Sequence, residues 1–402
     1  MRGDIIVFLI LAVSQIAGWG AVGFVAVVAR DIAGDLGMGL PGVFLGSSVM
    51  FVAMAVATPV AGRGFRRFGA RRVMAAGAAI IGGGLGVIAV APGPIAYFAG
   101  WALAGTGGAM FLTTAAYVYL AGLADTAARG RIGTLMLVTG LAGSVFWPVT
   151  GVLDHLLGWR GAAAVYAMAM ASLVAPLVLF GLPEAGAGDA ANEARDADRA
   201  ARPAGRRQVF VLIVAAVALN GFVSFGIESV GIELFRAMGT ELTHAVAIAA
   251  ALGLFKLAGR IVDLAGGRRW DALSTALVAG VAMPLGLAAV GLSGAGPGLS
   301  TGAVAAYLVL FGIGSGAFAV ARATMPLVFY RRADYAAAMS AIAVPLNLIN
   351  ALAPPVLAGL LVAAGPRAVL GLMTALGALA LVLLLLRLGR LRPAAAPGGE
   401  LA

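Results

Sequence analysis

Uninterrupted apolar runs of about twenty residues dominate this chain and limit the folds available to it. The hydrocarbon core of a bilayer is roughly 30 Å thick, so a helix rising about 1.5 Å per residue needs about 20 apolar residues to cross it. Six such runs lie in the first half, at about 5–29, 41–61, 73–91, 95–120, 132–153 and 160–181. Six more follow at about 208–234, 244–264, 273–292, 302–325, 335–363 and 366–388. The sequence therefore predicts an all-α membrane protein with twelve transmembrane helices.

The charge pattern and the missing motifs exclude several classes of protein. Of the 402 residues, 62% are hydrophobic and 11% charged, whereas about a quarter of the residues in a soluble domain are charged. The net charge of +10 comes from arginines between the apolar runs, which indicates lipid head groups and no nucleic-acid partner. There is no cysteine, and His155 and His244 lie far apart in the sequence, so we expect no metal. Without a phosphate-binding loop or nucleophile elbow, we expect no cofactor and no enzyme.

A polar stretch at 183–207 divides the chain into two sets of runs. It is too polar to insert into a bilayer, so we predict an N-terminal six-helix bundle at 1–182, a cytoplasmic linker at 183–207, a second six-helix bundle at 208–392 and a cytoplasmic tail at 393–402. The connections on the side of the linker hold most of the arginines, and those on the other side hold four: Arg30, Arg160, Arg236 and Arg367. Because positive loops stay inside, we expect a multi-pass protein of the cell inner membrane with both termini cytoplasmic.

Two connections, 62–72 and 259–269, repeat one spacing. A glycine is followed four positions later by Arg66 or Asp263, a second glycine comes three positions after that, and two arginines follow after one more residue. Each comes after the second helix of a six-helix set. The spacing resembles the signature loop of the major facilitator superfamily, although Arg66 stands where that family has Asp. The resemblance implies two six-helix bundles around a central cavity, with alternating access by rocking of the halves. It assigns gating roles to Gly62, Arg66, Gly69, Arg71, Gly259, Asp263, Gly266 and Arg268. Arg322, near the inner end of the run at 302–325, is expected to act as a gate that could pair with Asp263 or as a lipid-facing anchor, and substrate contact is the alternative.

Three further segments resemble a bacterial branch of this superfamily that is distantly similar to oxalate/formate and monocarboxylate carriers. They are 144–148, 158–160 and 322–327. In those carriers an arginine on helix 8, eight residues before the loop Asp, binds the substrate carboxylate. Here Lys256 stands seven residues before Asp263. The resemblance thus implies a small organic anion as substrate.

Ionisable residues inside the apolar runs are the candidate site residues, because a charge in hydrocarbon costs at least about 2.5 to 3.5 kcal/mol. Lys256 is the only lysine of the chain and lies near mid-membrane, with Arg260 one turn away on the same face. We expect both to contact an anionic substrate. The alternatives are a snorkelling or ion-paired Lys256 and an Arg260 that pairs with Asp263 or acts as a gate.

Further candidates carry a carboxylate or an uncharged polar group. Glu228 is a candidate for proton coupling, and helix-end capping or pairing with Arg236 is the alternative. The same capping or pairing is expected of Glu233, which lies beyond it in the same run. The polar and aromatic candidates for substrate binding are Asn220, Asn347, Asn350, Gln15 and Trp19, and weaker ones are Tyr117, Tyr119 and Trp147. Hydrogen bonding between helices is the alternative role for each of them.

The favoured function is a monomeric secondary active transporter of a small solute, an organic anion such as a carboxylate. A proton is its candidate coupling ion. A proton-coupled efflux pump for lipophilic drugs is the alternative, indicated by the Gly- and Met-rich helices and by Glu228. A non-transporting receptor or scaffold is disfavoured because the chain has no sizeable soluble segment beyond the linker. Glycine-rich runs at 82–84, 105–108 and 312–316 are expected to allow close helix contacts.

Overall fold

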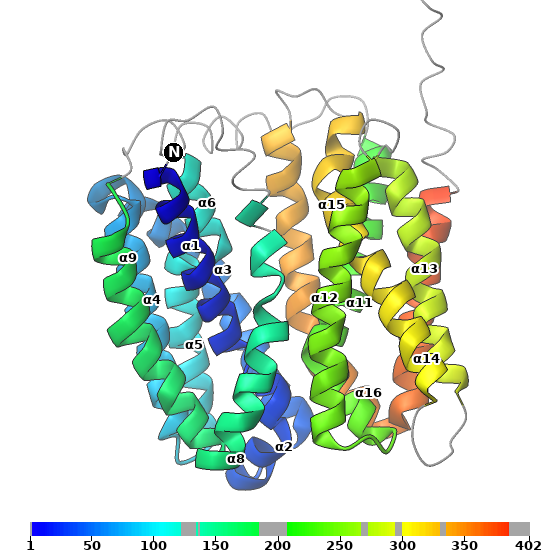
Figure 1. The fold of residues 1–402 in the computed structure, drawn as a ribbon, viewed down its shortest axis with the longest axis horizontal. Coiled ribbons are helices and arrows are strands. Elements are labelled where there is room, and N and C mark those ends of the chain that lie inside the picture. Colours follow the sequence, from blue (N-terminus) through cyan, green and yellow to red (C-terminus); the bar gives the residue numbers. More distant parts are fainter. Residues whose placement is uncertain are drawn as a thin grey trace, which may run out of the picture.

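The described part of the chain is helical and forms two groups that stand side by side (Figure 1). The computed structural model describes residues 2–121, 134–135, 137–184, 207–266, 272–293, 300–329 and 335–385. No strand occurs among these residues.

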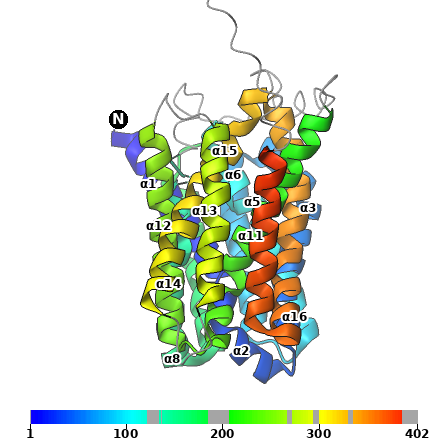
Figure 2. The ribbon, with the colours of Figure 1, turned by 90° about the vertical axis from the view of Figure 1, so that its right-hand side faces the viewer.

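The first group holds α1 (Arg2–Val22), α2 (Val25–Leu36), α3 (Leu40–Phe68), α4 (Ala70–Ala89), α5 (Pro94–Phe111), α6 (Thr113–Ala121), α8 (Ala142–Met168), the π-helical turn η1 (Ala169–Val174) and α9 (Ala175–Gly181). The second holds α11 (Arg207–Ala237), α12 (Leu242–Gly266), α13 (Ala272–Leu292), α14 (Thr301–Ala306), the π-helical turn η3 (Tyr307–Gly312), α15 (Ile313–Phe329) and α16 (Tyr335–Leu383). Figure 2 shows that the helices of the second group run roughly along one common axis.

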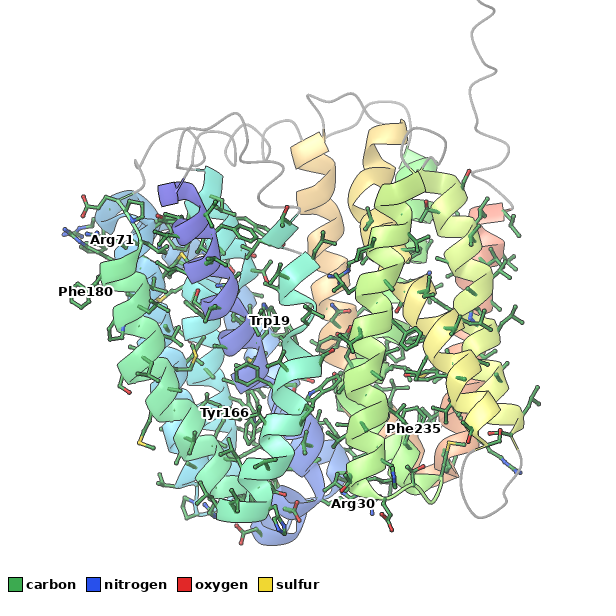
Figure 3. All side chains as sticks on the ribbon, in the orientation of Figure 1. Trp19, Arg30, Arg71, Tyr166, Phe180 and Phe235 are labelled. Carbon is green, nitrogen blue, oxygen red and sulfur yellow. The ribbon has the colours of Figure 1, made fainter. Side chains whose placement is uncertain are left out.

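The two ends of the molecule differ in which chain segments they hold. The N-terminus and the end of α9 lie at the upper end in Figure 1, and α2 lies at the lower end. We call the upper end the linker face, since α9 leads there to Glu184. We call the lower end the Arg30 face. Figure 3 labels Arg71 at the linker face and Arg30 at the opposite end.

Ten helical stretches among the described residues are long and apolar enough to cross a membrane. Two of them, Leu137–Gly181 and Leu348–Leu383, have 45 and 36 residues, whereas one crossing needs about 20. Each is interrupted by a glycine with positive φ, Gly158 at 68° and Gly365 at 79°. In Figure 1, α8 descends to the Arg30 face and the chain then returns to α9 at the linker face. Two crossings fit each long stretch, and the total of twelve stays a prediction.

Two of the expected helix ends were placed too early. The first run was expected to end at residue 29, but α2 continues to Leu36 because Ile32 and Leu36 are buried while Asp31 and Asp35 face outward. The second was expected to end at residue 61, but α3 continues to Phe68. Helices can extend beyond the hydrocarbon, where charged side chains are solvated.

The glycines of the expected close contacts lie where helix backbones meet. A Cβ built at Gly84 of α4 would lie 2.7 Å from the carbonyl oxygen of Gly100 on α5. One built at Gly316 of α15 would overlap the carbonyl oxygen of Lys256 on α12, and one at Gly259 would overlap that of Ile313. The α12 and α15 backbones are therefore in direct contact around Lys256. This contact fixes the position of the Lys256 main chain, from which its side chain extends.

Candidate functional site

A cavity of about 530 Å³ lies between the two helix groups and is lined by residues from both. The first group contributes mainly apolar and aromatic side chains, among them Trp19, Phe51 and Trp147. The second contributes Glu228, Lys256 and Arg260, which are the charged residues among the described lining. Two cations against one carboxylate give this lining a formal charge of +1.

Lys256 and Glu228 form an ion pair within the second group. The Lys256 ammonium donates a hydrogen bond to Glu228 Oε1, so α12 is tied to α11. The lysine side chain is 9% exposed and the carboxylate 44% exposed. Glu228 is therefore the more accessible partner, and the pairing with Arg236 considered from the sequence gives way to a pairing with Lys256.

This ion pair predicts a loss of stability for Lys256→Met, because Glu228 would lose its cation. The loss should be modest, about 1 to 2 kcal/mol, since water screens a carboxylate that is nearly half exposed. The double variant Lys256→Met/Glu228→Gln should recover most of the lost thermal stability in detergent. A single variant as stable as the parent would contradict a structural role for the pair.

Arg260 reaches from α12 across the cavity to the first group. Its Nη1 donates to the carbonyl oxygen of Leu137 at 3.3 Å. In a regular helix the Leu141 N–H would bond to that carbonyl, but here it bonds to Val138 at 3.0 Å. The guanidinium lies against Gly140, where an added Cβ would overlap it. A helix irregularity thus supplies both the acceptor and the space for this arginine.

A similar irregularity accounts for Gln15. The helix is interrupted between α5 and α6, where the Ala115 N–H donates to the carbonyl oxygen of Leu112 and not to that of Phe111. Gln15 donates its amide to the Phe111 carbonyl at 2.7 Å and is fully buried. It is not among the residues that line the cavity, and its position indicates a structural bond between helices.

The other polar candidates divide between the cavity and the part of the chain that is not described. Trp19, Tyr117, Asn220 and Asn350 line the cavity. Trp19 donates to the Thr113 hydroxyl at 2.8 Å. The side chain of Asn347 lies outside the described part. The sequence reasoning missed Gly140 and Ser144, which carry no charge or aromatic ring that would have marked them.

Apart from Arg322, the gating candidates that the structure describes lie at the end of α3, the start of α4 and the last turns of α12. Asp263 accepts a hydrogen bond from the Thr275 hydroxyl at 2.6 Å, which joins α12 to α13. The segment that begins at Gly62 was expected to be a connection, but up to Phe68 it forms the last part of α3. The helix ends at Gly69, whose φ is 80°. Gly266 ends α12. The side chains of Arg66 and Arg322, and all of Arg268, lie outside the described part.

Arg71 holds the start of the connection that follows α9. It donates to the Leu182 carbonyl at 3.2 Å and to the Glu184 carboxylate at 2.7 Å. Tyr119 donates to the carbonyl of Pro183 at 3.0 Å. The first signature segment therefore binds the end of the first helix group.

An ion-pair cluster joins the two groups at the Arg30 face. Glu233 of α11 is fully buried and bonds to Arg30 of α2 and, at 2.9 Å, to Arg236. Pairing of Glu233 with Arg236 was anticipated, but Arg30 was not, because the sequence placed it just beyond the first helix. Figure 3 shows Arg30 at the lower end, where the groups meet.

The comparisons with known proteins agree with this architecture. The Major Facilitator Superfamily profile matches residues 7–299, which is more than half of the chain. The chain belongs to the Major Facilitator Superfamily. It is therefore a multi-pass membrane protein with the fold of the superfamily's transporters.

Several solved structures share the fold of this superfamily member. One is a bacterial homologue of the human lysosomal transporter Spinster, in an inward-facing and occupied conformation, with a TM-score of 0.75 and 16% identity over 98% of this chain and 100% of that chain. The nucleoside transporter NupG has a TM-score of 0.75 and 13% identity over 94% and 98% of the two chains. A D-xylose–proton symporter has a TM-score of 0.74 and 15% identity over 95% and 97%. No curated protein matches the sequence. These TM-scores show that the chain shares the fold of these structures.

Proposed function

We propose that this protein is a secondary active transporter that moves a small organic anion by alternating access. The observation that carries the proposal is the cavity between the two groups, whose described charges are Lys256, Arg260 and Glu228. A positive lining attracts an anion and disfavours a cation. Ionisable residues at membrane depth mark substrate or ion pathways in transporters.

The proposal includes an orientation. Arg71 lies at the linker face (Figure 3), and Arg71 and Arg72 both bond to Glu184. By their order along the sequence, the other arginine-rich connections are expected on the same side. Under the positive-inside rule this face is cytoplasmic. The Arg30–Glu233 contact then closes the external end of the cavity, and Glu228 is the candidate for proton coupling.

The charges of the cavity predict that two substitutions change the substrate affinity in opposite directions. For an anionic substrate, Arg260→Gln should weaken binding roughly ten- to a hundredfold, because a hydrogen bond to a charged group contributes about 1.5 to 3 kcal/mol. Glu228→Gln should tighten binding by about three- to tenfold, because Lys256 is released from its partner and a like charge is removed. Binding of radiolabelled mono- and dicarboxylates to purified protein measures both changes.

The control and the competing function use the same assay. Arg72, which is 62% exposed at the linker face, is the matched arginine, and Arg72→Gln should leave the affinity unchanged. If the substrate is a cationic lipophilic drug, the affinity changes should have the opposite signs, and Glu228→Gln should lose binding. That result would favour the efflux function over the proposed one. Absence of any carboxylate binding, with no effect of either cavity variant, would also overturn it.

A further inference from the structure

Asn220 belongs to the cavity lining, and its side-chain oxygen is a hydrogen-bond acceptor that no described residue satisfies. Its Nδ2 donates to the Ala216 carbonyl at 3.2 Å, and because a carbonyl can only accept, this bond fixes which way the amide points. Its Oδ1 is buried and has no hydrogen-bond partner among the described residues. The side chain lines the cavity and the residue is 1% exposed. A buried acceptor without a hydrogen bond costs free energy. Oδ1 is therefore suited to accept a hydrogen bond from a donor group of a ligand.

A second helix repeats this feature. Asn350 of α16 also lines the cavity, and its Oδ1 is buried without a hydrogen-bond partner in the described structure. Helices α11 and α16 pack extensively against one another. Two adjacent helices therefore each contribute an asparagine with an unpaired amide oxygen to the lining that also holds the cationic groups of α12.

We infer that the substrate is a hydroxylated carboxylate, with its carboxylate toward Arg260 and Lys256 and its hydroxyl groups donating to the oxygens of Asn220 and Asn350. This rests on the proposed function and names its substrate class. A hydroxyl satisfies a neutral amide oxygen without adding charge. An ammonium group would add a second positive charge to a lining that is already positive. The acceptors thus select a hydroxy acid over both a plain carboxylate and an amino acid.

Matched ligands test the inference on the purified full-length protein. Butyrate, 3-hydroxybutyrate and 3-aminobutyrate form one series, which differs in a single substituent. Hexanoate and gluconate form a second pair of six-carbon acids, without and with hydroxyl groups. Isothermal titration should show 3-hydroxybutyrate binding about tenfold or more tightly than butyrate, because the deoxy compound leaves the amide oxygens unpaired. Gluconate should exceed hexanoate by at least the same factor.

Variants locate the discrimination. Asn220→Leu should bring the ratio of hydroxylated to deoxy affinities close to one, and Asn350→Leu should reduce it independently. Ser14 is a fully buried polar residue outside the cavity whose hydroxyl bonds to Leu11 at 3.0 Å, and Ser14→Ala should leave the ratio unchanged. Melting curves confirm that each variant is folded.

Each outcome decides the matter. Equal affinities within both wild-type pairs would overturn the inference and leave the anion-transport proposal standing. The same holds if 3-aminobutyrate binds best, or if Asn220→Leu and Asn350→Leu fold and keep the full ratio. The ligand series on the wild-type protein suffices if Asn220→Leu does not fold. Binding of none of the five ligands would contradict the inference, and the opposite-sign test on Arg260 and Glu228 would then decide the proposed function separately.

Discussion

Gly259→Ala is expected to destabilise the protein by about 1 to 3 kcal/mol, because inserting a methyl group into a close-packed contact forces the backbones apart. A Cβ at this position would overlap the carbonyl oxygen of Ile313. That oxygen belongs to the α15 backbone, which cannot move aside as a flexible side-chain end could. The displacement would also disturb the contact of Gly316 with Lys256. Melting curves and size-exclusion profiles in detergent measure the effect.

Gly62 is the matched control, since it occupies the equivalent place in the first signature segment. A Cβ built there meets no atom of the described residues within 4 Å. Because alanine is the better helix former by up to about 1 kcal/mol, Gly62→Ala should be neutral or slightly stabilising. If Gly259→Ala melts at the parent's temperature, α12 and α15 do not pack as described.

Glu233→Gln should open the Arg30 face of the cavity. The fully buried carboxylate joins Arg30 of the first group to the second group, and its loss would leave Arg30 and Arg236 without their shared partner. Breaking a fully buried pair costs about 3 to 5 kcal/mol. The arginines are 43% and 21% exposed, so solvent reduces this to roughly 1 to 3 kcal/mol. That shift corresponds to about a 5- to 150-fold change in the open population.

The absence of cysteine makes this shift measurable. Ser47 of α3 lines the cavity, and Ser47→Cys introduces a single thiol. A membrane-impermeant maleimide applied from the Arg30 face should label it faster in the Glu233→Gln background. Glu241→Gln is the control, because its carboxylate is 83% exposed. Equal labelling rates in all backgrounds would show that Glu233 does not hold this end closed.

Hydropathy could predict the spans because the bilayer acts on each stretch of about twenty residues separately. The same reasoning brought Glu228, Lys256, Arg260 and Asn220 to the cavity, since polar groups in hydrocarbon must face the protein interior. It could not decide their partners. Lys256 bonds to Glu228 on another helix, which depends on how α11 and α12 pack.

Contacts between the halves were beyond the sequence for a related reason. Arg30 and Glu233 are separated by 203 positions, and nothing in either local segment marks the other. The acceptor for Arg260 is a main-chain carbonyl that becomes available only through an irregular turn at 137–141. Neither the identity of Leu137 nor its hydropathy predicts that turn.

The described charges of the cavity all belong to one half of the molecule, and this has a consequence for how new specificities can arise. An architecture of two helix groups lets one group keep the electrostatic contacts while the other varies in shape. In this chain the α12 and α11 side carries the charged groups, and the first group offers mainly aromatic and small side chains. Exchange of the first half between related transporters would then alter the size of accepted molecules and preserve the preferred sign of their charge. Recombination between 184 and 207 would combine the size preference of one protein with the charge preference of another without cutting either described helix group.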